Sequence, residues 1–133
     1  MSYDTQRNAI QTRFKTQWQA SYPAIPIVYD NLRAEKAPDG YVALSILNGA
    51  SALRGMGALR LFRYPGVISV DVFVPAEKGT KLLDQYADAI EGIFRAQSFN
   101  GILCRSVDRR DLGKQDNFWR VNVSFPFTRD ELH

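Results

Sequence analysis

Alternating apolar and polar residues predict a β-sheet with one buried face. The alternation runs through residues 41–47, 67–74 and 119–127, with a weaker repeat at 102–107. A period of two places every second side chain on the same face of a strand, so each segment has an apolar and a polar face. The apolar file of the last segment begins with Trp119, which we therefore expect in the core. A further extended piece at 25–29 contains Pro26, which lacks an amide donor and therefore predicts an edge strand.

Two other segments carry apolar residues at helical spacing. Residues 4–21 hold three apolar side chains four positions apart: Ile10, Phe14 and Trp18. Asp4 is the candidate N-cap of this helix, and Thr80 is the candidate N-cap of a second helix over 80–97 that has a broader apolar face. The elements do not alternate regularly between strand and helix. The sequence therefore predicts an α+β fold, with an antiparallel sheet of four to five strands and two main helices packed on one face.

The composition is typical of one domain that works without cysteine or histidine chemistry. The 133 residues are enough for a single domain, 1–133, with its own core. The one cysteine, Cys104, excludes an internal disulfide and a cysteine-based zinc site, and we expect it to be a buried packing residue. The one histidine, His133, is the last residue of the sequence, so histidine-based catalysis lacks its usual group. We expect neither an enzyme nor a bound cofactor or metal.

The sequence predicts neither a membrane-spanning segment nor a secretory signal peptide. Residues 1–20 are polar and charged, and nowhere do about 18 apolar residues follow one another. The net charge of +3 is too small to indicate a nucleic-acid binder by itself. We expect a soluble protein made in a cytosol.

The stretch from residue 49 to residue 60 is the least ordinary part of the sequence. It is rich in glycine and alanine, yet it carries Leu53, Met56 and Leu59. Compact domains seldom keep such a long glycine-rich loop without a use for it. We expect a long flexible arm that becomes ordered against a neighbouring subunit, with an ordinary hairpin tip as the alternative.

Basic residues gather in two groups. Residues 40–70 contain no acidic residue but do contain Arg54, Arg60 and Arg63. The second group consists of Arg105, Arg109, Arg110, Lys114 and Arg120. Arginine suits bidentate contacts with carboxylates or phosphates, so these groups indicate a protein interface or a nucleic-acid surface. A solvated face of the sheet is the third interpretation.

Three acidic residues share one face of the predicted second helix: Asp84, Asp88 and Glu91. Paired carboxylates can bind a hard cation or carry out acid–base catalysis. No second cluster of carboxylates in the sequence completes a metal shell, so a solvated helix face is the simpler interpretation. The same residues could also face arginines across an interface.

Several blocks of the sequence together resemble a known family. These blocks are Ile25–Asn31, Arg63–Ile68, Val72–Thr80, Ala87–Ile90 with Ile93 and Phe94, Trp119–Val123 and Phe125–Phe127. They resemble the small tail-terminator, or tail-completion, proteins of long-tailed bacteriophages, a lambda-like family of minor tail proteins. The resemblance extends over residues 5–130 and rests on structural blocks without a catalytic motif.

The resemblance implies a function in virion assembly. In that family the fold is α+β, and six copies close into a ring that caps the tail tube, stops its growth and offers a surface to the head. The implied partners are further copies of the chain, the tail-tube protein and a head–tail connector protein, with DNA passing through the lumen. The implied location is the phage tail of the virion, assembled in the host bacterial cytoplasm. The isolated chain could be a monomer.

The resemblance also suggests which residues make contacts. The arm from Gly49 to Arg60 would reach a neighbouring subunit or the tube. The implied interface residues are Leu53, Arg54, Met56, Leu59, Arg60 and Arg63, with Asp84, Asp88 and Glu91 as a complementary acidic face.

Three other functions remain open at this stage. A single-stranded nucleic-acid-binding module would use the arginine groups and the aromatic residues Tyr41, Phe62 and Tyr64, and its affinity would fall steeply with salt. A related head–tail connector or neck protein would have a similar size. An enzyme built on Asp84 and Asp88 is the least favoured, because no second catalytic partner is visible.

Overall fold

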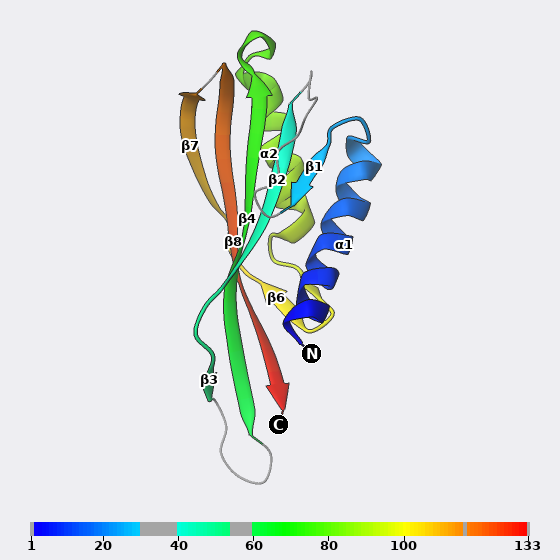
Figure 1. The fold of residues 1–133 in the computed structure, drawn as a ribbon, viewed down its shortest axis with the longest axis vertical. Helices are drawn as coiled ribbons and strands as arrows, with labels where there is room; N and C mark the ends of the chain where they lie inside the picture. Colours follow the sequence, from blue (N-terminus) through cyan, green and yellow to red (C-terminus); the bar gives the residue numbers. More distant parts are fainter. Residues whose placement is uncertain (1, 30–39, 54–59, 116, 133) are drawn as a thin grey trace.

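The computed structural model of the protein describes residues 2–29, 40–53, 60–115 and 117–132. These residues form two helices packed on one face of an eight-stranded sheet (Figure 1). The helices are α1 (Tyr3–Ser21) and α2 (Thr80–Phe94), and a short 3-10 turn (Ala76–Lys78) precedes α2. The strands are β1 (Ile27–Tyr29), β2 (Tyr41–Asn48), β3 (Ala52–Leu53), β4 (Leu61–Pro75), β5 (Ser98–Phe99), β6 (Ile102–Cys104), β7 (Asp108–Gln115) and β8 (Phe118–Leu132).

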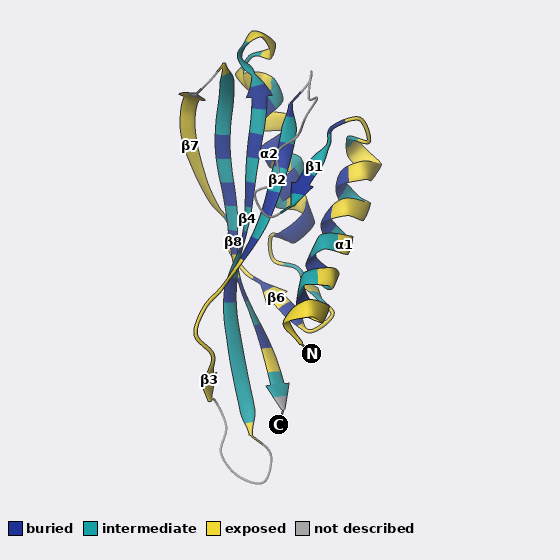
Figure 2. Ribbon diagram, in the orientation of Figure 1, coloured by how far each residue is buried: buried dark blue, intermediate teal, exposed yellow. Residues whose placement is uncertain are grey.

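The α+β class is confirmed, but the prediction of an antiparallel sheet of four to five strands was wrong. The sheet is mixed, because β1 runs parallel to β2. Its order is β1-β2-β4-β8-β6-β5, with β3 paired to β4 and β7 paired to β8. The strands that the sequence did not reveal show little alternation. β3 and β5 have two residues each, and residues 108–114 of β7 are all exposed (Figure 2).

The two central strands are much longer than the alternating pattern predicted. β4 and β8 pair over their whole length, from Leu61 opposite Leu132 to Pro75 opposite Phe118. The predicted strands covered only 67–74 and 119–127. Residues 61–65 are all partly buried, so no alternation marks this part of β4. Pairing between strands, rather than burial of one face, defines these strand ends.

The helix termini differ from the predicted ones. Ser2, not Asp4, caps α1, and its Oγ accepts a hydrogen bond of 3.1 Å from the backbone N–H of Thr5. Gly79, not Thr80, stands at the N-cap of α2 with a φ of 80°, in the left-handed region that glycine adopts without strain. α2 ends at Phe94, three residues before the predicted end.

The core lies between the two helices and the face of the sheet that they cover, here called the inner face (Figure 2). Ile10, Phe14 and Trp18 are fully buried, as their spacing predicted. The ring of Phe14 stacks on those of Trp18 and Phe94, with centroids 5.9 and 6.0 Å apart. β8 contributes an apolar file of Val121, Val123, Phe125 and Phe127. Trp119, at the start of this file, is only partly buried and packs against the edge of the core.

Candidate assembly surface

A narrow ribbon of strands projects beyond the part of the sheet that the helices cover (Figure 1). β2 ends at Asn48, opposite Gly66 of β4. Beyond that point residues 61–65 of β4 pair with residues 128–132 of β8 on one side and with Ala52 and Leu53 of β3 on the other. β6 pairs with β8 only at the base, over residues 127–129. We call residues 52–53, 61–65 and 128–132 the ribbon.

Gly66 allows neighbouring groups to pack directly against the backbone of β4 where the ribbon begins. A Cβ atom built on Gly66 would lie 2.5 Å from a ring carbon of Phe127 and 2.9 Å from the carbonyl oxygen of Leu47. Neither approach is possible for a real side chain, because both distances lie below van der Waals contact. The Phe127 ring therefore lies directly over the backbone of Gly66, and only glycine fits there.

The structure places three of the six predicted interface residues at or beside the ribbon. Leu53 is 48% exposed, which is unusual for a leucine in a paired strand. Arg60 is exposed just before β4, and Arg63 lies within β4. The other three, Arg54, Met56 and Leu59, lie outside the described residues.

Arg63 is held by a neighbouring carboxylate that the sequence analysis did not single out. Its guanidinium donates two hydrogen bonds to Asp130, 2.8 Å from Nε to Oδ1 and 2.9 Å from Nη2 to Oδ2. This hydrogen-bonded carboxylate raises the pKa of Arg63. No sequence signal joins residues 67 positions apart, because their proximity comes from the register of β4 and β8.

The two faces of the ribbon differ in character. Leu53 lies opposite Phe62 in the β3–β4 pair, and residues in opposite positions of an antiparallel pair share a face. Tyr64, two residues further on, lies on that face too, and its ring meets the ring of Tyr3 of α1 edge-on at 5.9 Å. This face of the ribbon therefore combines apolar and aromatic side chains with Arg129 and Glu131 of β8, which lie opposite Tyr64 and Phe62, whereas the opposite face carries the ion pair between Arg63 and Asp130.

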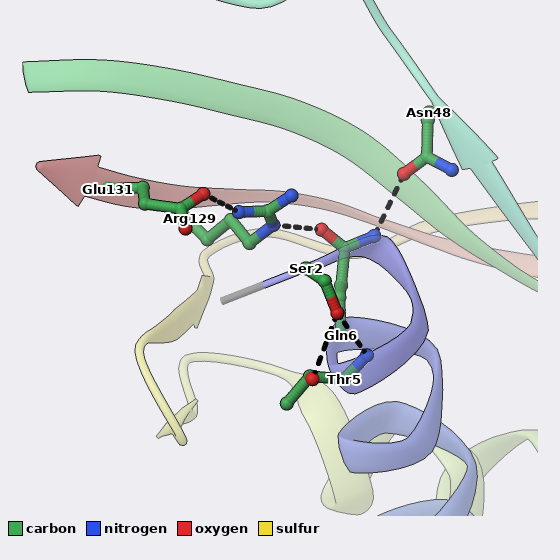
Figure 3. A network of polar contacts seen from close by, with 6 residues as sticks. All are labelled: Ser2, Thr5, Gln6, Asn48, Arg129 and Glu131. Carbon is green, nitrogen blue, oxygen red and sulfur yellow. Dashed lines mark hydrogen bonds and ion pairs between the residues drawn. The ribbon is translucent and has the colours of Figure 1, made fainter. Parts of the chain in front are cut away.

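A buried arginine joins the ribbon to α1, and the sequence analysis missed it. Arg129 of β8 is 3% exposed, and its Nε donates a hydrogen bond to Oε1 of Gln6 (Figure 3). Its Nη1 lies 2.9 Å from Oε2 of Glu131, while Nε2 of Gln6 donates a hydrogen bond of 2.8 Å to Oδ1 of Asn48. The signal that could have found it is the period of two, since Arg129 follows the buried file of β8 by two residues.

The predicted acidic face of α2 is partly neutralised by arginines of the same chain. Oδ1 of Asp84 accepts a hydrogen bond of 2.6 Å from Nη2 of Arg109 on β7, and this bond raises the pKa of Arg109. Glu91 lies 3.8 Å from Arg95, one helical turn away. Asp88 is exposed. Within the described residues, no group of three or more His, Cys, Asp or Glu side chains could hold a metal ion.

Most described residues of the two basic groups lie at opposite ends of β8. β7, which carries most of the second group, pairs with residues 118–124 of β8, whereas the ribbon uses residues 128–132 at the other end of that strand. Arg120 lies 3.4 Å from Asp71, so it too has a carboxylate partner in the chain. Arg105, Arg110 and Lys114 are exposed.

The outer face of the sheet, opposite the helices, carries an aromatic cluster at the end remote from the ribbon. The ring of Tyr41 stacks on that of Phe73 at 4.5 Å, and Phe118 meets both rings edge-on at 6.1 and 6.4 Å. The guanidinium of Arg120 lies 5.2 Å from the centroid of Phe73. Tyr41, a predicted stacking residue, is therefore engaged by contacts within the chain.

Cys104 is a packing residue, as expected from its apolar surroundings in the sequence. It is fully buried in β6, and burial raises the pKa of its thiol to about 11, with a smaller opposing effect of the positive charge of Arg13. The thiol is therefore protonated at neutral pH and poorly suited to nucleophilic attack.

A surface hollow of about 370 Å³ lies away from Cys104. It is lined by Pro75, Ala76, Glu77, Asn117 and Phe118, which include no nucleophile paired with a base.

In the described part of the chain, neither helix is long and apolar enough to cross a membrane. A mixed sheet covered by two helices on one face, with a projecting ribbon, is the architecture of the described chain. One solved structure shares this fold with a TM-score of 0.75 and 21% identity, over 97% of this chain and 96% of that chain. No curated protein matches the sequence.

A family model described as phage tail terminator protein matches residues 6–127. This match covers most of the chain, so the chain belongs to the phage tail terminator family, as the sequence blocks suggested. Its class is that of a structural protein of the bacteriophage tail.

Proposed function

We infer that this chain ends the growth of a tail tube by closing, with copies of itself, into a ring on the tip of the tube. The ring also offers a surface to the protein that joins the head, and its lumen is wide enough for DNA to pass. Family membership supports a role in tail termination. The projecting ribbon is the observation that carries the assembly part of the proposal, because it holds the exposed Leu53 beyond the part of the sheet that the helices cover.

A ring requires two different, complementary patches on each subunit, since its interface is heterologous. The ribbon and the segment that follows Leu53 in the sequence provide the first patch, with Leu53, Arg54, Met56, Leu59 and Arg60 as contact residues. Burying an exposed leucine side chain contributes about 1.5–3 kcal/mol. Apolar contacts therefore supply most of the affinity.

The second patch is the exposed face of α2 on the neighbouring subunit. Asp88 is exposed on this face, and Asp84 and Glu91 lie on the same side of the helix. The charge of Asp88 would guide Arg60, which is exposed, toward the correct register more than it would add affinity, whereas Asp84 and Glu91 contribute less because Arg109 and Arg95 lie beside them. Arg63 contributes less to this attraction because Asp130 already accepts its hydrogen bonds.

The direct test is the mass of the protein in solution by light scattering, alone and mixed with tail-tube protein, followed by electron microscopy. Closed rings, or tubes of limited length with a cap at one end, support the proposal. A protein that neither forms rings nor caps or shortens tubes contradicts it. A monomer in the absence of tubes is compatible, because a terminator that assembles on its tube needs only a weak ring interface in isolation.

A further inference from the structure

The burial of Arg129 is costly for a domain of this size. Gln6 and Arg129 are the buried polar or charged residues of the described part of the chain, and Arg129 is the charged one. Removing a guanidinium from water costs several kcal/mol, which hydrogen bonds and a nearby carboxylate only partly return. The preceding inward positions of β8 hold apolar residues, so an apolar side chain would continue the file at lower cost. Stability alone does not explain an arginine at this position.

The contacts of Arg129 and of its partner Gln6 join three parts of the fold. Gln6 belongs to the first turns of α1, and it also bonds to Asn48 at the end of β2. Glu131 and Tyr64 belong to the two long strands of the ribbon. The guanidinium of Arg129 thus connects α1 to the ribbon, and Gln6 extends the network to the end of β2 (Figure 3).

Two aromatic rings complete the surroundings of Arg129. Its guanidinium carbon lies 4.1 Å from the centroid of Tyr64 and 5.1 Å from that of Tyr3. Both distances are within the range of cation–π contacts, and the planar guanidinium can hydrogen-bond at its edge while its face rests on a ring. A lysine has no such plane, so it could not reproduce the edge and face contacts together.

We propose that Arg129 is a positioning residue that fixes the direction of the ribbon relative to α1, with Tyr3 and Tyr64 as its aromatic supports. β4 and β8 continue from the body into the ribbon as single strands with only the two-residue β3 beside them, and so narrow an extension can twist and bend. The network around Arg129 holds the extension to α1 on one face. The consequence for assembly rests on the proposed function, because a ring closes only if each ribbon meets its neighbour at the same angle.

The test measures the direction of the ribbon in the full chain. Spin labels are attached to Lys15→Cys on α1 and Arg60→Cys beside the ribbon, both at exposed positions, while the buried Cys104 remains unlabelled. Pulsed electron paramagnetic resonance then gives the distribution of distances between the labels. We expect a narrow distribution in the labelled parent protein and a broad or shifted one with Arg129→Lys or Tyr3→Ala.

Matched variants separate positioning from general stability. Tyr3→Phe keeps the ring beside Arg129 and is expected to restore the narrow distribution. Arg63→Gln removes an arginine from the opposite face of the ribbon and is expected to leave the distribution narrow. Tyr3 is 49% exposed, so its variants keep the core and carry the test even if Arg129→Lys does not fold. An unchanged distribution with Tyr3→Ala overturns the proposal.

The same variants distinguish a failure of positioning from a failure of the proposed function. If Tyr3→Ala broadens the distribution but tube length and ring formation stay normal, positioning holds and the role of the ribbon in assembly is refuted. If the distribution stays narrow, the positioning role of Arg129 is refuted whatever the assembly assay shows.

Discussion

Arg63 on β4 and Asp130 on β8 face each other across the strand pair and are joined by two parallel hydrogen bonds, 2.8 and 2.9 Å long. This bidentate pair lies on the surface of the ribbon, whereas Arg129, one residue before Asp130, is buried on the opposite face. Two arginines of the ribbon thus have opposite environments. The Arg63–Asp130 pair has the bidentate geometry of a strong ion pair, but it is exposed to water and salt.

We expect the coupling between Arg63 and Asp130 to be small and to decrease with salt, since solvent screens exposed charges. A double-mutant cycle of Arg63→Ala and Asp130→Ala, measured by urea unfolding at low and high salt, gives this coupling. A coupling that is large and independent of salt would contradict the exposed character of the pair.

Arg129→Ala is expected to lower the free energy of unfolding by about 1–3 kcal/mol, because it removes a hydrogen-bond partner from the buried Gln6 and the partly buried Glu131. Arg129→Met fills a similar volume without a charge and should retain clearly more stability. Urea unfolding of both variants measures the difference. Equal losses would mean that filling the space left by Arg129 has no stabilising effect at this position.

Gly66→Ala is expected to destabilise the protein by about 1–3 kcal/mol, because the new methyl group would meet the Phe127 ring and the Leu47 carbonyl. Gly92→Ala is the matched control. No atom lies within 4 Å of a Cβ at Gly92 in α2, so alanine there should stabilise the helix by roughly 0.5–1 kcal/mol. Thermal unfolding should therefore give shifts of opposite sign, and two shifts of the same sign would refute the tight packing at Gly66.

Stability is expected to fall at alkaline pH partly because of Cys104. Burial raises the pKa of this thiol from 9.0 to about 11, so the folded state keeps its proton at a pH where the unfolded state has lost it. The contribution is fully present below pH 9.0 and is lost as the pH rises toward about 11. One such proton corresponds to a slope of about 1.4 kcal/mol per pH unit. Unfolding of the parent and of Cys104→Ala across this range should give a shallower decline for the variant, and parallel curves would contradict the shift.

Leu53→Ser is expected to weaken assembly and to give longer, uncapped tubes, because it removes an apolar contact from the ribbon. Leu112→Ser changes a leucine of similar exposure, 38% against 48%, at the opposite end of β8 on strand β7. Tube lengths in electron micrographs, with circular dichroism to confirm folding, provide the comparison. Normal tube length with Leu53→Ser, or an equal effect of both variants, would refute the assignment of the ribbon as the contact surface.

The sequence predicted well the parts of the fold where one face is buried and the other is wet. The stripe of Ile10, Phe14 and Trp18 and the file of β8 from Val121 to Phe127 are buried as their spacing indicated. The prediction failed for β7, which is exposed on both faces, and for residues 61–65 of β4, which are all partly buried. Neither segment produces an alternation, because burial does not alternate along it.

The candidate surface was predicted as a segment rather than as a set of contacts. The apolar and arginine-rich stretch around Leu53 and Arg63 was identified from composition. Its partners were not, because Asp130 meets Arg63, and Asp84 meets Arg109, only through strand register and helix packing. Burial of Arg129 was not predicted, because arginine is seldom buried. An arginine two residues after an apolar file normally marks the point where the buried part of the strand ends.

By itself, the sequence determined the α+β class, the two helices, the inward files of the central strands and the family, because each depends on local periodicity or on contiguous blocks of residues. Only the tertiary structure decided that β4 and β8 continue into a ribbon, that Gly66 closes its base and that Arg129 is buried between it and α1. These features depend on which distant segments meet. Strand register and packing determine which segments make contact, and neither produces a periodic pattern in the sequence.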